Sequence, residues 1–367
     1  MKHPLYLFQP VKLKRKNHSL ALEPYGQFAE NASQRILDFP GRALGHSLAS
    51  SYEEKVTTDS WWQATPTHVP LNRLKEIHAF VDIRLNSAII LLLAQHQIPV
   101  HFYNWYGYYK GSFVPQQALF DGKLSIEQAL TWSDRSRRLA IAKQLIHGSL
   151  HHIRRCIRYY SYRDGLPNTL LYDLDDANVY IDSCFTINEL MGVEGMIRQH
   201  FYQVIDQSLR HGFALKGRVY HPPSNPTNAM ISFLNGLLYS TIQTELLHTR
   251  LDPSIGVLHS PGRRRKPLVW DVAEIFKPIF TEGVLLSLVR KKILRLEHFE
   301  EDKGFPLLTR DGRFRVVRAF EEKMRETVKL RQLGRSVSYR SIIRHECQKL
   351  ARSIQYGETF EPFKLDW

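Results

Sequence analysis

The chain has 367 residues, 43% hydrophobic and 23% charged, a composition typical of globular proteins and long enough for two domains. Fifty lysines and arginines against 36 aspartates and glutamates give a formal net charge of +14, which favours a polyanionic partner such as nucleic acid. The longest apolar run, 88–94, is too short to span a bilayer, and the amino terminus lacks a secretory pattern. Three scattered cysteines form no CxxC pair, so we expect a cytoplasmic protein without a disulfide framework or a thiolate zinc site.

Residues 1–114 predict a small β-rich domain. Short runs of strand-forming residues recur through it, at 5–11, 19–22, 99–103 and 108–114. A helix should begin after Asn86 or Ser87, because both residues are good N-caps. Residues 26–66 spread Gly, Ser and Ala among charged residues, which indicates an insertion into this domain.

We interpret residues 115–124 as a linker, because the spacing of apolar residues becomes helical beyond it. From 125 to 367 the pattern predicts a larger, all-α domain. Its expected helices cover 126–163, 186–211, 225–248 and most of 268–355. The fold class is therefore α+β, with the β-rich domain first and the helical domain second.

Glu194 interrupts the apolar stripe of the helix expected at 186–211. It follows Leu190 by four residues and precedes Ile197 by three, so all three share one face. A carboxylate buried without a partner costs several kcal/mol. It must therefore line a cleft, bind a metal, or pair with Arg198 one turn further on, and this pattern leaves the alternatives open.

Asp271 and Glu274 lie three residues apart and project from one face of an expected helix. Two negative charges at that spacing repel each other unless a cation lies between them. Lys277 could supply that cation, so an ordinary solvated helix end is the simplest interpretation of this segment by itself.

His259 lies in a loop between apolar residues and a basic run, which consists of Arg263, Arg264, Arg265 and Lys266. A single loop histidine is usually a surface residue, but this one gains weight from the company of three candidate carboxylates, Glu194, Asp271 and Glu274, and four basic residues. One imidazole with carboxylate oxygens is a ligand set that suits Mg²⁺ or Mn²⁺. Such a cation supports phosphodiester chemistry, and the neighbouring basic residues would hold a phosphate backbone.

Other motifs predict less. His147 and His151 stand four apart on an expected helix and could chelate a metal, but they lead into an arginine- and tyrosine-rich run more typical of a phosphate-facing surface. The sequence contains no Walker loop, GxGxxG or GxSxG motif, so nucleotide-cofactor and serine-hydrolase functions have no support.

Four ordered motifs resemble the CRISPR-associated integrase family, the larger of the two proteins that acquire spacers. They are Glu194-Gly195 through His200-Phe201-Tyr202; Arg218 with Asn225-Pro226-Thr-Asn228-Ala229; Leu251-Asp252-Pro253 through Leu258-His259; and Asp271-Val-Ala-Glu274-Ile-Phe-Lys277-Pro278. The insertion at 26–66 is longer than the resemblance leads one to expect, and Lys277 stands where arginine is more usual.

The resemblance implies a metal-dependent DNA integrase, which joins the 3′-hydroxyl ends of a short DNA duplex to the CRISPR repeat by transesterification. It implies Glu194, His259 and Glu274 as ligands of Mg²⁺ or Mn²⁺, with Asp271 orienting a ligand or water. It also implies a homodimer and a small ferredoxin-like partner protein. Candidate DNA contacts are the basic residues around these motifs: Arg198, Arg218, Arg263, Arg264, Arg265, Lys266 and Lys277.

Two alternatives remain at this level. The same residues would serve a metal-dependent endonuclease that cuts branched DNA without integrating it. A non-catalytic scaffold that only binds DNA is the second alternative, although retention of all four site residues, Glu194, His259, Asp271 and Glu274, argues against it.

Overall fold

The computed structural model describes most of the chain, namely residues 2–25, 36–38, 68–104, 106–116, 121–164, 174–219, 222–263, 265–302, 304–330 and 334–365. The chain divides into two compact units, Met1–Leu119 and Phe120–Trp367. The division falls within the segment that the sequence indicates as a linker. Of the insertion at 26–66, only Ile36–Asp38 belongs to the described residues.

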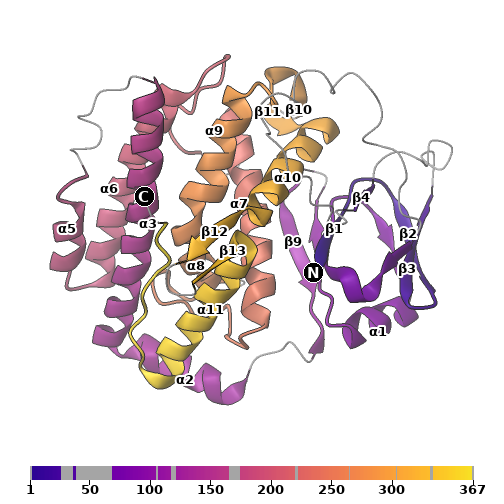
Figure 1. Cartoon of the computed structure of the whole chain (residues 1–367), viewed down its shortest axis with the longest axis horizontal. Coiled ribbons are helices and arrows are strands. Elements are labelled where there is room, and N and C mark those ends of the chain that lie inside the picture. The colour runs from indigo at the N-terminus through magenta and orange to yellow at the C-terminus, as the bar shows by residue number, and fades with distance from the viewer. Residues whose placement is uncertain are drawn as a thin grey trace. The chain divides into compact units, whose positions relative to one another are not determined.

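The described residues of the first unit form two sheets, one α-helix and a short 3-10 helix, Leu71–Arg73 (Figure 1). One sheet has the order β4-β1-β6-β8-β9, with strands Ile36–Asp38, His3–Leu7, Leu74–Ala79, Val100–Tyr103 and Tyr109–Phe113. The other has the order β5-β3-β2-β7, with strands His68–Pro70, Ser19–Pro24, Val11–Lys16 and Ile83–Arg84. The β-rich character predicted for this part of the chain is confirmed.

The local features of this unit follow from a few residues. Helix α1, Ser87–Gln95, begins where the N-cap predicts, because the Asn86 side chain accepts a hydrogen bond from Ile89 N at 3.0 Å. The run predicted as one strand at 5–11 is instead the end of β1 and the start of β2. Pro10, which has no N–H to donate, lies between them.

The second unit is mostly helical, as the sequence predicts. Its α-helices are α2 (Gly122–Ser133), α3 (Arg135–Asp164), α5 (Ala177–Ser183), α6 (Ile187–Ser208), α7 (Pro226–Leu247), α8 (Pro267–Lys277), α9 (Gly283–Arg290), α10 (Arg310–Arg325) and α11 (Tyr339–Tyr356). The helical segment expected at 126–163 consists of two helices that meet at Asp134, whose side chain caps α3 by accepting from Ser136 N at 3.0 Å.

Two short hairpins, which the sequence analysis does not predict, also belong to the second unit. They pair β10 (Phe299–Asp302) with β11 (Phe305–Leu308), and β12 (Thr327–Leu330) with β13 (Arg335–Ser338). The domain is therefore helical with two β-hairpins rather than purely helical.

The helices of this unit pack around α8. Helix α3 contacts both α6 and α8, and α7 contacts α8 and α11 (Figure 1). The extended C-terminal segment contacts both α3 and α8: Leu365 N donates to His152 Nε2 at 3.3 Å, and the Phe363 and Phe276 rings stack with their centroids 6.2 Å apart. The two helices that bear the carboxylates, α6 and α8, are therefore both fixed against α3.

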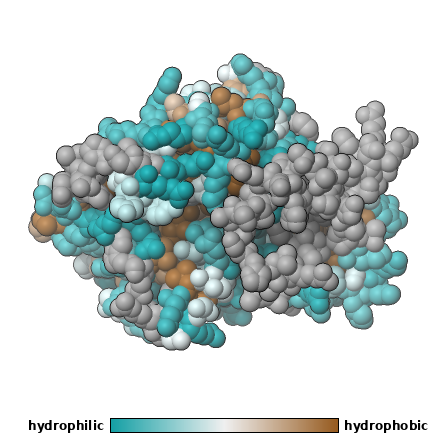
Figure 2. Space-filling model, turned by 45° about the horizontal axis from the view of Figure 1, so that its top comes forward, coloured by the Kyte–Doolittle hydropathy of each residue, from teal (hydrophilic) through white to brown (hydrophobic). Residues whose placement is uncertain are grey.

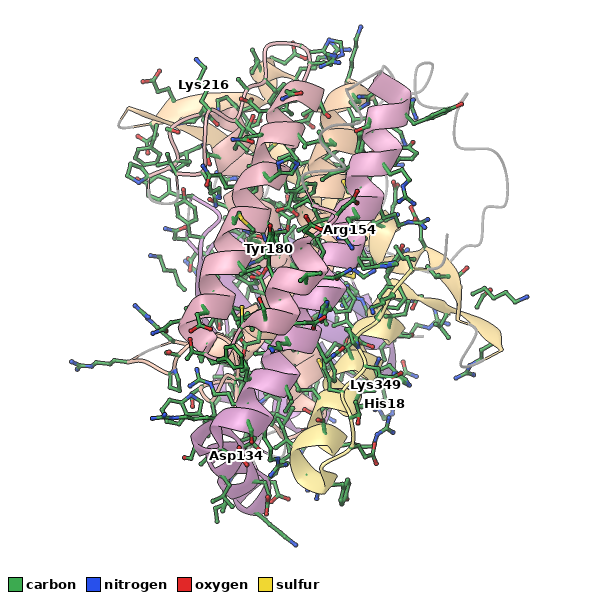
Figure 3. The ribbon with its side chains drawn as sticks, turned by 90° about the vertical axis from the view of Figure 1, so that its left-hand side faces the viewer. His18, Asp134, Arg154, Tyr180, Lys216 and Lys349 are labelled. Carbon is green, nitrogen blue, oxygen red and sulfur yellow. The ribbon has the colours of Figure 1, made fainter. Side chains whose placement is uncertain are left out.

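Hydrophilic side chains cover most of the coloured surface in Figure 2, with smaller apolar patches between them. In Figure 3, helices α3, α5 and α6 are seen from the side; Arg154 of α3 donates to the carbonyl oxygen of Asp175 at 3.0 Å. Within the described part of the chain, no helix is long and apolar enough to cross a membrane.

Candidate active site

Glu194 is brought to the site by helix α6. The helix begins with a capping box, in which Thr186 Oγ1 accepts from Glu189 N at 3.2 Å and the Glu189 side chain bonds back to the cap. The expected apolar stripe is buried, including Leu190 and Ile197. Glu194 lies within that stripe, and its side chain is only 18% exposed.

Asp271 and Glu274 are both buried on α8, which begins with Pro267 at its first position. A solvated helix end, the simplest interpretation of this segment from sequence, is therefore wrong. Glu274 Oε2 accepts from Arg198 Nη2 at 2.5 Å, and its Oε1 pairs with the Lys277 ammonium. Two cations thus balance Glu274, whereas the hydrogen bonds of Asp271 come from the His259 loop.

The His259 loop is anchored on Asp271. One Asp271 oxygen, Oδ2, accepts from the backbone N–H groups of Val257 at 2.6 Å and Leu258 at 3.1 Å. The other, Oδ1, accepts from His259 N at 2.9 Å and lies 2.8 Å from His259 Nδ1. Because a carboxylate only accepts, Nδ1 carries a proton, and in the neutral imidazole Nε2 keeps its lone pair.

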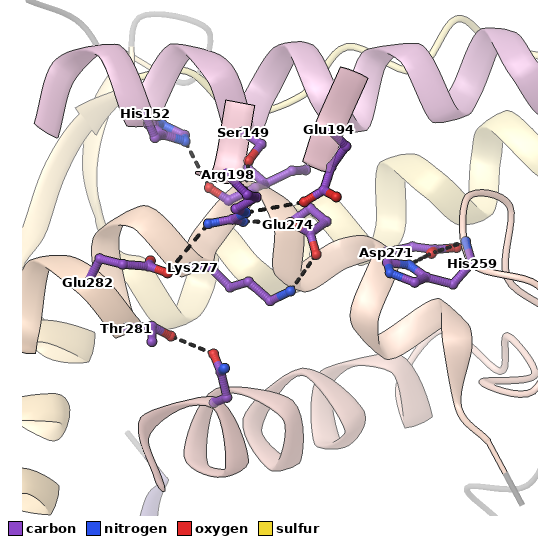
Figure 4. Close-up of polar contacts among 12 residues, drawn as sticks. Ser149, His152, Glu194, Arg198, His259, Asp271, Glu274, Lys277, Thr281 and Glu282 are labelled. Carbon is purple, nitrogen blue, oxygen red and sulfur yellow. Dashed lines mark hydrogen bonds and ion pairs between the residues drawn. The ribbon is translucent and has the colours of Figure 1, made fainter. Parts of the chain in front are cut away.

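These groups influence one another electrostatically. Burial raises the pKa of Glu194, and the nearby Glu274 carboxylate raises it further. Burial disfavours the ionised form of Glu274 as well, but Lys277 and Arg198 outweigh this and hold its pKa well below the usual range. Burial lowers the pKa of His259, yet Asp271 overcomes it, so the net shift is upward. Figure 4 shows Glu194, Arg198, Glu274 and Lys277 directed toward one another.

A π-helical turn, Pro278–Glu282, follows α8 directly. It begins at a proline, which has no N–H to donate, and Gly283 N closes it by bonding to Pro278 O. This turn directs Glu282 back toward the site, where Arg198 Nη1 lies 3.4 Å from Glu282 Oε1.

The candidate DNA contacts have different surroundings in the structure. Arg198 and Lys277 are engaged with buried carboxylates, which differs from the phosphate-contacting role expected from sequence. Arg218 donates to Asn228 Oδ1 at 2.8 Å and so ties its loop to the start of α7. Arg263 and Arg265 are exposed, whereas Lys266 donates to Gln243 Oε1 at 2.8 Å. The remaining candidate, Arg264, lies outside the described residues.

Sequence reasoning missed two residues that shape the site. Glu282 stands alone among apolar neighbours, the same pattern that singled out Glu194, and could have been found in that way. Gly256 has no such pattern: a Cβ there would lie 2.8 Å from Asp271 Oδ2 and 2.8 Å from the carbonyl oxygen of His259. Only glycine lets the loop approach Asp271 this closely.

The paired histidines of α3 belong to separate contacts. His147 Nε2 lies 2.9 Å from Asp182 Oδ1, and His151 Nε2 lies 2.8 Å from the carbonyl oxygen of Leu365. Each side chain has its own partner on another segment, so both residues connect segments of the helical unit.

The donor set fits a hard divalent cation. Glu194 and Glu274 supply oxygens, His259 supplies the free Nε2, and the Asp271–His259 contact is the arrangement that usually fixes a metal-binding imidazole. As the side chains stand, no group of three or more His, Cys, Asp or Glu among the described residues is gathered closely enough to hold an ion. Glu274 retains lone pairs beyond those used by Arg198 and Lys277, so the chemistry of the site is suitable, and its three ligands would have to move closer together to share an ion.

Comparison with known proteins identifies the family. The family model described as "CRISPR associated protein Cas1" matches residues 50–322. A protein of Thermodesulfovibrio yellowstonii named CRISPR-associated endonuclease Cas1 3 is 36% identical over 299 residues, which cover 82% of this chain and 91% of that protein.

Solved structures agree too. A Cas1 protein from Thermotoga maritima superposes with a TM-score of 0.75 at 28% identity, covering 99% of this chain and 100% of the other. A casposase bound to its integration product has a TM-score of 0.78 at 17% identity, covering 100% of this chain and 93% of the other, and it shows the shared fold alone. Because the family model spans most of the chain and the curated relative matches nearly along its full length, the chain is a member of the Cas1 family of CRISPR-associated proteins.

Proposed function

We propose that this protein is a metal-dependent DNA integrase, which joins the 3′-hydroxyl ends of a short DNA duplex to the CRISPR repeat by transesterification. One observation carries the proposal: His259 Nδ1 donates to Asp271, which leaves Nε2 of the neutral ring available, while Arg198 holds together Glu194 of α6, which is 18% exposed, and the buried Glu274 of α8. This is a ligand set with its supporting hydrogen bonds already in place.

In this proposal Glu194, His259 and Glu274 hold Mg²⁺ or Mn²⁺, and Asp271 fixes the orientation of the imidazole. The bound cation would polarise the phosphodiester and lower the energy of the developing negative charge. Asp271 also fixes the loop itself, because it accepts from Val257 N and Leu258 N. The loop therefore presents His259 in one orientation before any ligand arrives.

The substrate is proposed to be double-stranded DNA, both as the short spacer precursor and as the repeat that receives it. Support comes from the net charge of +14 and from the exposed Arg263 and Arg265, which directly follow the His259 loop. The casposase of the same fold is described as bound to an integration product. The resemblance also leads us to propose a homodimer that works with a small ferredoxin-like partner protein.

A second candidate is endonuclease activity on branched DNA without integration. The name of the Thermodesulfovibrio relative, an endonuclease, favours it. The same four residues would serve, because cleavage and strand transfer differ in the attacking group, a water or a 3′-hydroxyl, and not in what the metal does.

Strand transfer of a short duplex into supercoiled plasmid with Mn²⁺ and the partner protein tests the proposal. Glu194→Ala and His259→Ala should abolish transfer, whereas His147→Ala, a histidine–aspartate contact outside the site, should retain it. Transfer at the normal rate in either site variant would refute the assignment of residues. If the wild type cuts branched DNA but transfers no duplex, the endonuclease is favoured instead.

A further inference from the structure

Arg198 contacts three carboxylates that come from three different segments. Its Nε lies 3.3 Å from Glu194 Oε1 on α6, and its Nη2 lies 2.5 Å from Glu274 Oε2 on α8. Its Nη1 lies 3.4 Å from Glu282 Oε1 on the π-helical turn. The Arg198 side chain is 9% exposed, so these contacts form away from bulk water (Figure 4). Charge pairs interact more strongly in such a low-dielectric environment than in water.

The three contacts are unequal. The bond to Glu274 is short and charge-assisted, whereas the one to Glu282 is at the long limit for a hydrogen bond. Glu282 is buried, and its second oxygen, Oε2, has no hydrogen-bond partner in the described part of the chain. Burial raises the pKa of Glu282, although Arg198 opposes the shift. Glu282 is therefore the least satisfied of the three carboxylates, and it can accept more from Arg198 than it does here.

The charges of the site favour a rearrangement when a cation binds. Glu194, Glu274 and Glu282 face two resident cations, Arg198 and Lys277. An arginine cannot release its proton in a protein, so it cannot lose its charge when a divalent ion arrives. It therefore competes with the ion for Glu194 and Glu274, which are the proposed ligands, and another acceptor nearby would relieve that competition.

We propose that Arg198 is the resident counter-cation of the metal-free site and that Glu282 is its second acceptor, which holds the guanidinium once a divalent cation takes Glu194 and Glu274. This inference rests on the proposed metal-dependent function. Arg198 and Glu282 are positioning residues here, since neither is a ligand. The arrangement keeps two glutamates from repelling each other before metal binding and gives the displaced guanidinium a partner afterwards.

The opposing possibility is that Arg198 is a fixed brace that the ligands need at all times. The two possibilities predict opposite changes in metal affinity when Arg198 is removed. If Arg198 competes with the metal, its removal strengthens metal binding and weakens the metal-free protein. If Arg198 is a fixed brace, its removal weakens both.

The experiment measures Mn²⁺ affinity by electron paramagnetic resonance, together with the melting temperature of the metal-free protein. Arg198→Gln should bind Mn²⁺ about tenfold more tightly, because the competing cation is gone; a tenfold change in affinity corresponds to about 1.4 kcal/mol. Without metal the same variant should melt at a lower temperature, because its carboxylates have lost their counter-charge. Glu282→Gln should bind Mn²⁺ about tenfold more weakly, because a neutral amide is a poor acceptor for the displaced guanidinium. Glu321→Gln is the matched control: this buried glutamate of α10 pairs with Arg340 at 2.5 Å, and its loss should lower the melting temperature without changing the affinity.

The double variant Arg198→Gln/Glu282→Gln shows whether Glu282 acts through Arg198. In that case Glu282→Gln should have little effect on Mn²⁺ affinity once Arg198 is absent. An equal effect in both backgrounds, an unchanged affinity in Glu282→Gln, or weaker binding in Arg198→Gln would each overturn the proposal. If Arg198→Gln does not fold, the affinity of Glu282→Gln decides alone.

Glu194→Ala separates this inference from the function on which it rests. If the wild type binds Mn²⁺ and Glu194→Ala does not, the metal site stands and the variants above test Arg198 and Glu282. If Glu194→Ala binds Mn²⁺ as the wild type does, the ligand assignment itself fails, and the proposal falls with it.

Discussion

Replacing Asp271 by asparagine isolates the interaction on which the proposed metal site depends. The aspartate accepts two hydrogen bonds on each oxygen: Val257 N and Leu258 N on Oδ2, and His259 N and Nδ1 on Oδ1. Asparagine has nearly the same shape but only one acceptor oxygen. In its better orientation the oxygen keeps Val257 and Leu258, and the amide nitrogen faces His259.

Two consequences follow for His259. Its partly buried backbone N–H loses its partner, which costs about 1–3 kcal/mol. Its ring can adapt by moving the proton to Nε2, so that Nδ1 accepts from the new amide. The remaining hydrogen bonds to the side chain weaken as well, because its acceptor changes from a charged carboxylate to a neutral amide. We therefore expect the free energy of unfolding to fall by about 3 kcal/mol in total. That loss should lower the melting temperature by roughly 6–12 °C.

The change of tautomer matters more than the loss of stability, because an Nε2 that carries a proton cannot bind a metal. Asp271→Asn should therefore fold and yet lose most of its Mn²⁺ affinity and strand transfer. Nitrogen-detected NMR of the histidine rings reports the tautomer, and calorimetric titration reports the affinity. Asp182→Asn, at the exposed contact with His147, is the matched control and should change neither.

Normal Mn²⁺ affinity in Asp271→Asn, or an imidazole that keeps its proton on Nδ1, would refute this reasoning. A loss of affinity in Asp182→Asn of similar size would show that the effect is not specific to the site.

Three further predictions concern other parts of the helical unit. Gly256→Ala should lose about 1–3 kcal/mol of stability, because the new Cβ clashes with Asp271. The control Gly236→Ala on α7, where a Cβ meets no atom within 4 Å, should be neutral or stabilising. Urea unfolding measures both variants, and an equal loss of stability in the two would contradict the close approach at Gly256. Removing the exposed Arg263 or Arg265 should reduce the log–log salt slope of duplex binding by about 0.9 for each phosphate that the side chain neutralises, and an unchanged slope would exclude them from the interface. Burial lowers the pKa of His152 to about 3, so the unfolded chain binds a proton below pH 6.5 that the folded chain does not, and stability is lost as pH falls below that value. His152→Leu should be less stable than the wild type at pH 7. Between pH 6 and 4, however, its free energy of unfolding should fall by about 1.4 kcal/mol less per pH unit than that of the wild type. The same acid dependence in both proteins would contradict the burial of a neutral His152 ring.

Local patterns account for much of this protein. Asn86 and Asn225 cap the helices that follow them, because a short polar side chain before an apolar periodic run can accept a hydrogen bond from an otherwise unpaired N–H of the first turn. The structure confirms both caps. The stripe that includes Leu190 and Ile197 is buried because a helix repeats every 3.6 residues whatever surrounds it. The motifs around Glu194, His259, Asp271 and Glu274 likewise led to the Cas1 family without coordinates.

Partnership between distant residues depends on how the helices pack. Nothing in the sequence says that Arg198 reaches Glu274, 76 residues away, rather than a phosphate, or that Asp271 holds the whole His259 loop. Glu282 reaches the site because a proline directs the chain into a π-helical turn, an effect of hydrogen-bond geometry and not of periodicity. The order of residues identifies which groups could perform the chemistry; the packing of α3, α6 and α8 settles which charges meet, because the energy of a buried charge depends on its neighbours in space.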